Sequence, residues 1–150
     1  MIMQARIKKT KFFFEHRKAF LAQLSKEIAC FDRYCFKKNV IGRVRLNTFS
    51  DIAWEKMGLD LSQYKNIHFY DYTKSMKRAM WSTLNPCANY HLCYSFNEES
   101  KWDECVELLE AGGNVTVVFR DVEYKPAHNK IGKLPETWRG YEVEDGDSTD

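Results

Sequence analysis

The feature that most constrains this chain is an alternation of short strand-like runs with segments of helical spacing. Strand-like runs rich in β-branched and aromatic residues occupy positions 40–46, 66–72, 89–95 and 114–119, with helical patterns between them. Because successive strand–helix–strand units join by right-handed crossovers, this order predicts a parallel sheet. We therefore expect an α/β fold with a four-strand, mostly parallel sheet or half-barrel built from βα units.

A long amphipathic helix is predicted ahead of the sheet, over about 11–38. Its apolar residues step by four, four, three and four positions and so share one helical face: Phe20, Leu24, Ile28, Phe31 and Cys35. Most charged residues of the segment fall outside this stripe. The helix therefore needs a partner surface, which the sheet would provide.

The length and the hydrophobic content favour a single domain. A chain of 150 residues, 44% of them hydrophobic, can bury a sizeable core over 1–150. Residues 120–134 have the composition of a long loop, 134–143 can hold a short strand, and the acidic segment 143–150 is expected to be a flexible tail. An open sheet leaves strand edges unpaired, so a homodimer that pairs these edges is also expected.

Charge is nearly balanced over the whole chain but unevenly distributed. Lysine plus arginine number 23 and aspartate plus glutamate 21, a net charge of +2, which argues against strong non-specific binding of nucleic acid. Bases dominate the first 45 residues, whereas acids dominate the last ten. The basic end, including Arg17 and Lys18, is suited to phosphate or to an acidic host protein, and a solvated helix face is the alternative.

Cysteine usage and hydropathy indicate a reducing cytoplasm. The chain has five cysteines, an odd number, and their spacings match no common zinc pattern. Free thiols and no bound metal are therefore expected. No signal peptide is recognisable, and no apolar run approaches the ~20 residues of a membrane span. No membrane partner is therefore expected.

Polar residues gather after each predicted strand. In open parallel sheets, ligands bind beyond the carboxyl ends of the strands, where the loops converge. Amide, hydroxyl and carboxylate groups with one lysine suit a ribose, a base edge or a phosphate. The same residue types also cap helices and form turns, which is the alternative interpretation. The candidate ligand-binding residues are Asn47, Ser50, Asp51, Asp71, Thr73, Lys74, Ser95 and Asn97, with Arg120 and Asp121 after the fourth strand.

The sequence gives weaker support to metal binding and to nucleophilic catalysis. His68 and His91 lie within predicted strands and lack an evident third metal ligand, so packing against the sheet is the simpler interpretation. Cys93 follows His91 by two positions on the same strand face, which separates their Cβ atoms by ~7 Å, too far for a reliable nucleophile–base pair. The aspartates at 145 and 147 lack full calcium-loop spacing. The catalytic residues, if any, therefore remain unknown.

Several segments share their order and spacing with one known family. They are Arg-Val-Arg-Leu-Asn at 43–47, Ser-Asp-Ile at 50–52, Phe-Tyr-Asp-Tyr-Thr-Lys at 69–74, Asn-Tyr-His-Leu at 89–92, Gly-Tyr at 140–141 and Asp-Gly-Asp at 145–147. In these segments the chain resembles the phage gene-product-eighty-eight family over nearly its whole length. The resemblance implies a phage setting, with the cytoplasm of a bacterial host as the expected location, and a radical-SAM-like partial β/α barrel, but no specific reaction.

The resemblance also implies two departures. Relatives carry a cysteine-rich segment ahead of the long helix, similar to the cluster-binding start of radical enzymes that use S-adenosylmethionine, and a further strand beyond the Asp-Gly-Asp segment. We expect this chain to lack those cluster ligands, and hence the cofactor, and to be a shortened form or a fragment.

Two functions from different classes follow. The first is a phage-type protein that binds a polar, nucleotide-like ligand at the carboxyl ends of the parallel strands. The second is an anti-defence protein that inhibits a host nuclease or defence complex through protein–protein contacts made by the basic helix. Whether the chain is an enzyme is left open.

Overall fold

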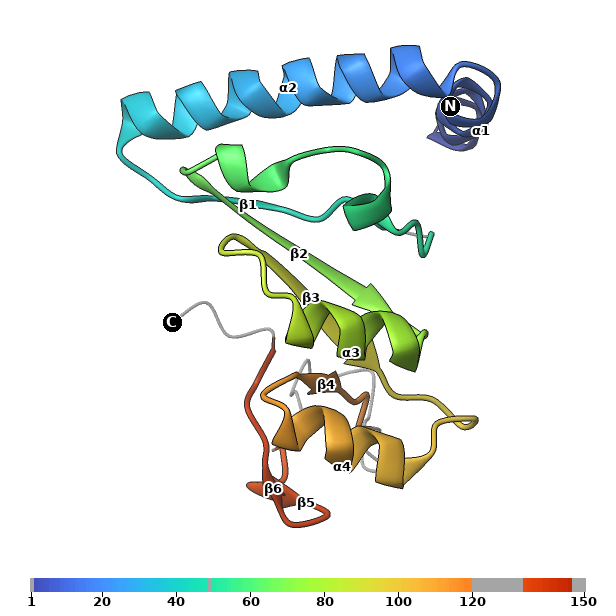
Figure 1. Cartoon of the computed structure of the whole chain (residues 1–150), viewed down its shortest axis with the longest axis vertical. Coiled ribbons are helices and arrows are strands. Elements are labelled where there is room, and N and C mark those ends of the chain that lie inside the picture. The colour runs from blue at the N-terminus through green and yellow to red at the C-terminus, as the bar shows by residue number, and fades with distance from the viewer. Residues whose placement is uncertain (1, 49, 120–133, 147–150) are drawn as a thin grey trace, which may run out of the picture.

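The predicted parallel sheet is confirmed in a computed structural model, which describes residues 2–48, 50–119 and 134–146. Strands β1 (Gly42–Val44), β2 (Ile67–Thr73), β3 (Tyr90–Ser95) and β4 (Val115–Thr116) lie in the order β1-β2-β3-β4 (Figure 1). All three strand pairs are parallel. The chain is thus an α/β protein, and its fourth strand is shorter than the predicted 114–119.

Helices connect the strands as the alternation predicts. Helix α3 (Met76–Leu84) joins β2 to β3, and α4 (Trp102–Glu110) joins β3 to β4. Ser75 caps α3, because its hydroxyl accepts a hydrogen bond from the backbone N–H of Arg78. Between β1 and β2 the chain forms only two short 3₁₀ helices, η1 (Trp54–Lys56) and η2 (Leu61–Gln63).

The prediction of one helix over 11–38 is wrong at its N-terminal end. The structure has two helices, α1 (Ile2–Glu15) and α2 (Arg17–Lys38), which meet at a sharp bend (Figure 1). His16 between them has φ −134° and ψ 49°, outside the helical range. The bend lets the buried Phe13 ring meet Trp54 and Phe20, at centroid distances of 6.0 and 5.3 Å. Tertiary packing therefore overrides local helical continuity here.

The core lies on one face of the sheet, in two clusters. One cluster joins α2 and the 3₁₀ segments to the sheet and contains Ile28, Leu61, Tyr64, Ile67, Phe69, Tyr90 and Leu92. The other joins α3 and α4 to β3 and contains Ala79, Tyr94, Cys105 and Leu108. Since strand side chains alternate, all the buried residues of β2 and β3 point to this face. The three helices therefore cover the same side of the sheet.

A small antiparallel hairpin packs beside α4. Strands β5 (Thr137–Trp138) and β6 (Tyr141–Glu142) flank Arg139 and Gly140, which have φ values of 52° and 88°. Two consecutive positive φ values define the tight turn that matches strand twist in a two-residue hairpin loop. The sequence predicted only one short strand in this region. Residues 147–150 of the predicted tail and residues 120–133 of the loop predicted over 120–134 lie outside the described residues.

Candidate functional site

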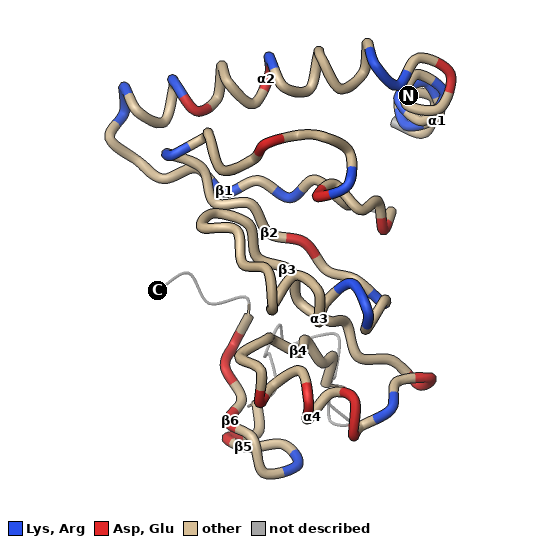
Figure 2. The backbone as a smooth tube through the Cα atoms, viewed as in Figure 1, with Lys and Arg blue, Asp and Glu red and all other residues tan. Residues whose placement is uncertain are grey.

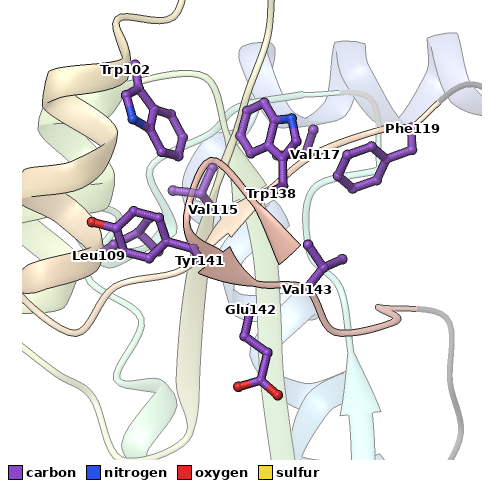
Figure 3. A pocket seen from close by; sticks show the side chains of 9 residues that line it. All are labelled: Trp102, Leu109, Val115, Val117, Phe119, Trp138, Tyr141, Glu142 and Val143. Atoms are coloured by element: carbon purple, nitrogen blue, oxygen red, sulfur yellow. The ribbon is translucent and has the colours of Figure 1, made fainter. Parts of the chain in front are cut away.

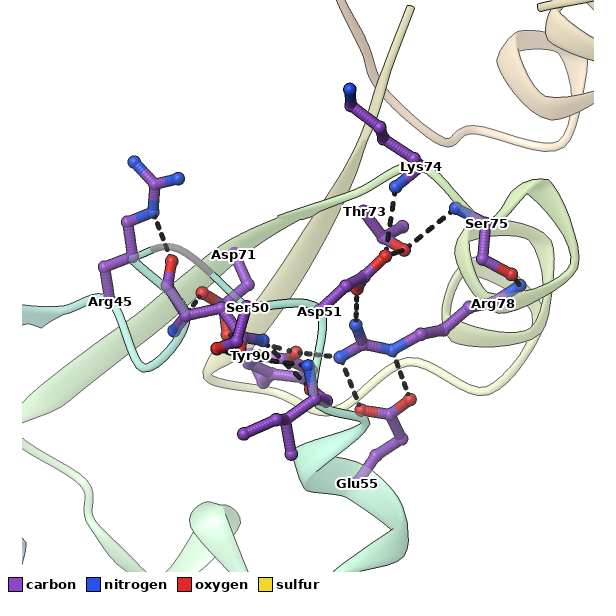
Figure 4. A network of polar contacts seen from close by, with 12 residues as sticks. Arg45, Ser50, Asp51, Glu55, Asp71, Thr73, Lys74, Ser75, Arg78 and Tyr90 are labelled. Atoms are coloured by element: carbon purple, nitrogen blue, oxygen red, sulfur yellow. Dashed lines mark hydrogen bonds and ion pairs between the residues drawn. The ribbon is translucent and has the colours of Figure 1, made fainter. Parts of the chain in front are cut away.

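Polar residues that follow β1 and line β2 come together at the carboxyl edge of the sheet (Figure 4). Because β1 and β2 are parallel neighbours, the loop after β1 lies beside the end of β2. Asn47 and Asp51 come from that loop, whereas Asp71 and Thr73 belong to β2. Tyr90 reaches the same region from the start of β3, with its hydroxyl facing Asp71. The convergence of strand ends anticipated from the sequence is therefore present in the fold.

Asp71 is a fully buried carboxylate held by its neighbours. Its Oδ1 accepts a hydrogen bond from the Asn47 backbone N–H at 2.8 Å, and its Oδ2 accepts from Asn47 Nδ2 at 3.2 Å. The Tyr90 hydroxyl lies 3.5 Å from Oδ2. Burial raises the pKa of Asp71 from 3.8 to about 6, although the Asn47 hydrogen bonds act in the opposite direction. The pKa of this carboxyl group therefore lies well above its usual value.

Asn47 fixes the loop after β1. Its Oδ1 accepts hydrogen bonds from the Ser50 hydroxyl at 2.8 Å and from the Ile52 backbone N–H at 3.1 Å. Its Nδ2 also donates to the Ile52 carbonyl at 2.9 Å. Asn47 itself is 1% exposed, so the amide end of each of these bonds is shielded from bulk water. Asn47 thus links the loop after β1 to Asp71 through its hydrogen bonds.

A second network centres on Arg78 of α3, which is 8% exposed. Its guanidinium donates to both Glu55 carboxylate oxygens at 2.7 and 2.9 Å, to Asp51 Oδ1, and to the Tyr90 hydroxyl at 3.1 Å. Burial lowers the pKa of Arg78, but the Glu55 hydrogen bond and nearby negative charges more than offset it and raise the pKa above its usual value. Burial and the Asp71 charge raise the pKa of Tyr90. Arg78 therefore stays charged and Tyr90 stays neutral.

Asp51 joins this ion pair to the end of β2. Its Oδ2 accepts hydrogen bonds from the Thr73 hydroxyl at 2.8 Å and from the Lys74 backbone N–H at 3.2 Å. Thr73 Oγ1 in turn accepts from the Ser75 backbone N–H at 3.0 Å. The polar atoms of Asp51 and Thr73 are thus engaged within the protein, where they organise the entry into α3.

A pocket opens next to this network. It has a volume of about 370 Å³ and lies between η1 and α3, lined by Glu55, Lys56, Ser75, Lys77, Arg78 and Trp81. Arg78 is neutralised by Glu55 and Asp51, which leaves Lys56 and Lys77 as cations available at the wall. Trp81 is 45% exposed and supplies an aromatic surface. The pocket therefore pairs positive charge with a flat apolar ring.

The remaining candidates from the sequence lie outside this network. The Lys74 side chain extends away from it (Figure 4), and its ammonium has no partner in the part of the chain that the structure describes. The Ser100 hydroxyl donates to Asn97 Oδ1 at 3.1 Å in the turn before α4, which is a turn-forming role and not a helix cap. Ser95 lies at the end of β3, beside Thr116 of β4. Arg120 and Asp121 fall outside the described residues.

Among the described residues, His91 and Cys93 do not form a reactive pair. His91 is exposed, and burial raises the pKa of the Cys93 thiol although a hydrogen bond with Thr116 acts the other way, so a thiolate is disfavoured. Over residues 2–48, 50–119 and 134–146, no cluster of three or more His, Cys, Asp or Glu side chains could hold a metal ion. Within the same ranges, no helix is both long and apolar enough to cross a membrane.

A second pocket, of about 90 Å³, lies between α4, β4 and the hairpin (Figure 3). Aromatic rings dominate its wall, with Trp102 and Trp138 at a centroid distance of 4.9 Å and Trp102 and Tyr141 at 5.8 Å. The Arg139 guanidinium lies 4.7 Å from the Trp138 ring centroid. In Figure 3 the one carboxylate, that of Glu142, points away from the rings. These contacts fasten the hairpin to α4 and supply no polar chemistry.

Three central residues were not among the candidates from the sequence: Glu55, Arg78 and Tyr90. Glu55 lies in a 3₁₀ turn, Arg78 in a basic helix, and Tyr90 within a strand whose alternation marks it as core. Their proximity arises from contacts between residues 12 and 23 positions apart in the sequence. The spacing of neighbouring residues in the sequence does not reveal such long-range contacts.

Comparison with known proteins gives one result. A family model described as Gene product 88 matches residues 2–150, which confirms the resemblance to that phage family seen in the sequence. The further likeness to radical enzymes is not confirmed by this match. No curated protein and no solved structure matches the chain.

Proposed function

The chain belongs to the Gene product 88 family, a phage family of unknown function, and we propose that it binds a phosphate-bearing, nucleotide-like small molecule at the carboxyl edge of its sheet. The observation that carries this proposal is the pocket between η1 and α3. Its volume of about 370 Å³ falls in the usual range of small-molecule sites. The pocket also lies beside strand ends, where parallel sheets commonly bind ligands.

The residues that line the pocket suit a ligand that has both a phosphate and an aromatic base. Lys56 and Lys77 provide positive charge for a phosphate, while the exposed Trp81 ring offers a stacking surface for a base. The Arg78 network makes the wall rigid, because it ties η1, β2 and α3 together through Glu55 and Asp51. In this proposal Asn47, Asp71 and Thr73 position the loop and α3, and they do not contact the ligand.

Calorimetric titration with AMP, adenosine and inorganic phosphate tests this proposal. AMP is expected to bind more tightly than either of its parts, because only AMP engages the lysines and Trp81 together. Lys77→Ala and Lys56→Ala should each weaken AMP binding about tenfold, the usual value of a charge-assisted hydrogen bond. Lys65→Ala, an exposed lysine outside the pocket, is the matched control.

The titration has a clear contrary outcome. If AMP does not bind, or if it binds equally to the wild type and to both lysine variants, the pocket does not hold the phosphate. Trp81→Leu tests the stacking surface separately from the lysines. This variant should bind adenosine and AMP more weakly but should bind phosphate as the wild type does.

A second candidate function is inhibition of a host defence protein through the N-terminal helices. Met3, Ile7 and Phe14 are exposed on α1 and follow one another by four and seven positions, which aligns them as a seam for a second helix. Lys11 borders this seam, and basic residues cluster at this end of the molecule (Figure 2). These features favour an acidic amphipathic helix as the contacting element.

The predicted contact residues Arg17 and Lys18 begin α2 and are exposed, with the Arg17 guanidinium 4.6 Å from the Phe13 ring centroid. A synthetic helix of three Glu-Ile-Ala-Ala-Leu-Glu-Lys repeats is a suitable probe. Fluorescence anisotropy should detect binding that Arg17→Glu with Lys18→Glu, or Ile7→Gln, abolishes. Equal binding by these variants, or no binding by the wild type, would exclude this contact.

A further inference from the structure

The sheet has a second face that none of the described helices covers. Helices α2, α3 and α4 all pack on the face that contains Ile67, Phe69, Leu92 and Tyr94. The side chains between these residues point to the opposite side, because strand side chains alternate. We call this opposite side the open face; in β1 to β4 it comprises Arg43, His68, Tyr70, Tyr72, His91, Cys93, Ser95 and Thr116.

The open face has an unusual composition for a sheet surface. Arg43, His68, Tyr70 and His91 are exposed, with Tyr70 at 38%. Among its described strand residues there is neither an aliphatic side chain nor a carboxylate. Asp71, the acidic residue of β2, points to the covered side and is 0% exposed. The face therefore offers rings, hydroxyls and positive charge.

These side chains are neighbours in space. The strand register pairs Arg43 with His68 and Tyr70 with His91. The His68 and His91 rings are 6.5 Å apart between centroids, and the Tyr70 ring lies 6.3 Å from that of Tyr72. These two ring pairs form an aromatic group across the two central strands, where the register places Tyr70 opposite His91.

Arginine borders this group on the side of β1. The Arg45 guanidinium lies over the Tyr72 ring at 4.7 Å from its centroid, and Arg45 Nε donates to the Asn47 carbonyl at 2.8 Å. The second bond holds Arg45 in place and leaves its terminal nitrogens directed away from that carbonyl. Arg43 stands next to His68 on the same edge. Two cations therefore line the rim of the aromatic group.

The amino-acid composition of the open face indicates which kind of partner can bind there. A missing helix or a second sheet would require an apolar, largely aliphatic surface, as on the covered side. An acidic protein would match the arginines but would leave the rings without a partner. Single-stranded nucleic acid matches both features, because its bases stack on aromatic side chains and its phosphates pair with arginine. Four-stranded sheets with exposed rings bind RNA single strands in this way.

We propose that the open face of the sheet binds single-stranded nucleic acid, with bases stacked on Tyr70 and the neighbouring histidine rings and phosphates held by Arg43 and Arg45. This site lies on the side of the sheet opposite the helices and does not depend on the AMP pocket. The nearly balanced net charge implies that stacking, more than a long-range field, supplies the affinity. The salt dependence should accordingly be modest.

Fluorescence anisotropy with labelled twelve-nucleotide dT and rU oligonucleotides tests the proposal. We expect binding that weakens about fivefold or more in Tyr70→Thr, since one stacked base is lost. The strand propensity of threonine should preserve β2. Arg43→Gln should also weaken binding. Two phosphate contacts predict a loss of about sevenfold in affinity between 50 and 200 mM salt.

A matched control places the same chemical changes elsewhere. Tyr34→Thr and Arg33→Gln alter an exposed tyrosine and an exposed arginine of α2, and they should leave oligonucleotide binding unchanged. Lys77→Ala should also have no effect, which distinguishes this site from the AMP pocket. Circular dichroism and urea denaturation establish that each variant is folded.

Three results would overturn the proposal. One is the absence of binding by the wild type at 100 µM protein. Another is equal binding by Tyr70→Thr, Arg43→Gln and the wild type. The third is binding that depends on Lys8 and Lys11 of α1 instead, tested by reversing both to glutamate, which would assign nucleic acid to the basic helix.

Discussion

Replacement of Arg78 by methionine should be the most destabilising single change in the polar network. Arg78 is 8% exposed, and its partner Glu55 has a side chain only 9% exposed. Methionine fills similar volume but leaves the Glu55 carboxylate buried without its cation. It also removes the guanidinium from Asp51 and from the Tyr90 hydroxyl.

The expected cost follows from this geometry. Breaking a buried ion pair by removal of one partner costs about 3–5 kcal/mol, because an uncompensated charge remains inside the protein. Domains of ordinary size have an unfolding free energy of about 5–15 kcal/mol. With a urea dependence of about 2 kcal/mol per molar, the midpoint should fall by about 1.5–2.5 M.

Urea denaturation followed by tryptophan fluorescence measures this change. Trp54, which is buried directly before Glu55, provides a local probe. The double variant Arg78→Met with Glu55→Gln should recover part of the loss, since the amide replaces the orphaned carboxylate. Lys101→Met is the comparison, because the ion pair of Lys101 with Glu104 at 3.2 Å is exposed and should be worth under about 1 kcal/mol.

The reasoning would be refuted by a small effect. If Arg78→Met shifts the urea midpoint no more than Lys101→Met, the guanidinium does not compensate a buried charge. A double variant that is less stable than Arg78→Met would contradict the assignment to Glu55 in particular.

Three further predictions concern the core and the strand ends. Burial raises the pKa of Asp71 from 3.8 to about 6, so the folded protein binds the Asp71 proton more tightly than the unfolded chain does. The protein should therefore lose about 3 kcal/mol of stability as pH rises from about 4 to about 6. Asp71→Asn should remove this pH dependence in urea titrations at several pH values. Gly42→Ala should cost about 1–3 kcal/mol in thermal unfolding, because the new Cβ would lie 2.6 Å from Phe31 Cε1, whereas Gly146→Ala, with no atom within 4 Å, should be neutral. Asn89→Ala removes an amide that donates to three backbone carbonyls at 2.9, 2.9 and 3.2 Å, so it should lower stability by about 2–3 kcal/mol and speed amide exchange in the η2 region.

The location of the candidate site was partly accessible from sequence. The sequence predicts a role for Asn47, Asp51, Asp71 and Thr73, because these residues follow or lie near the ends of strands and parallel strands bring such ends together. The sequence alone did not distinguish a ligand contact from an internal hydrogen bond. That distinction depends on whether a donor finds a partner inside the fold, as Thr73 does in Asp51.

The sequence by itself determined the α/β class, the parallel order of the strands and the helices α3 and α4 that connect the last three strands. These features depend on alternation and periodicity, which are properties of neighbouring residues. The tertiary structure alone decided the bend at His16, where the buried Phe13 packs on Trp54, and the assembly of Glu55, Arg78 and Tyr90. It also decided which face of the sheet the helices leave uncovered. Such features arise from contacts between segments far apart in the chain, and no local pattern encodes them.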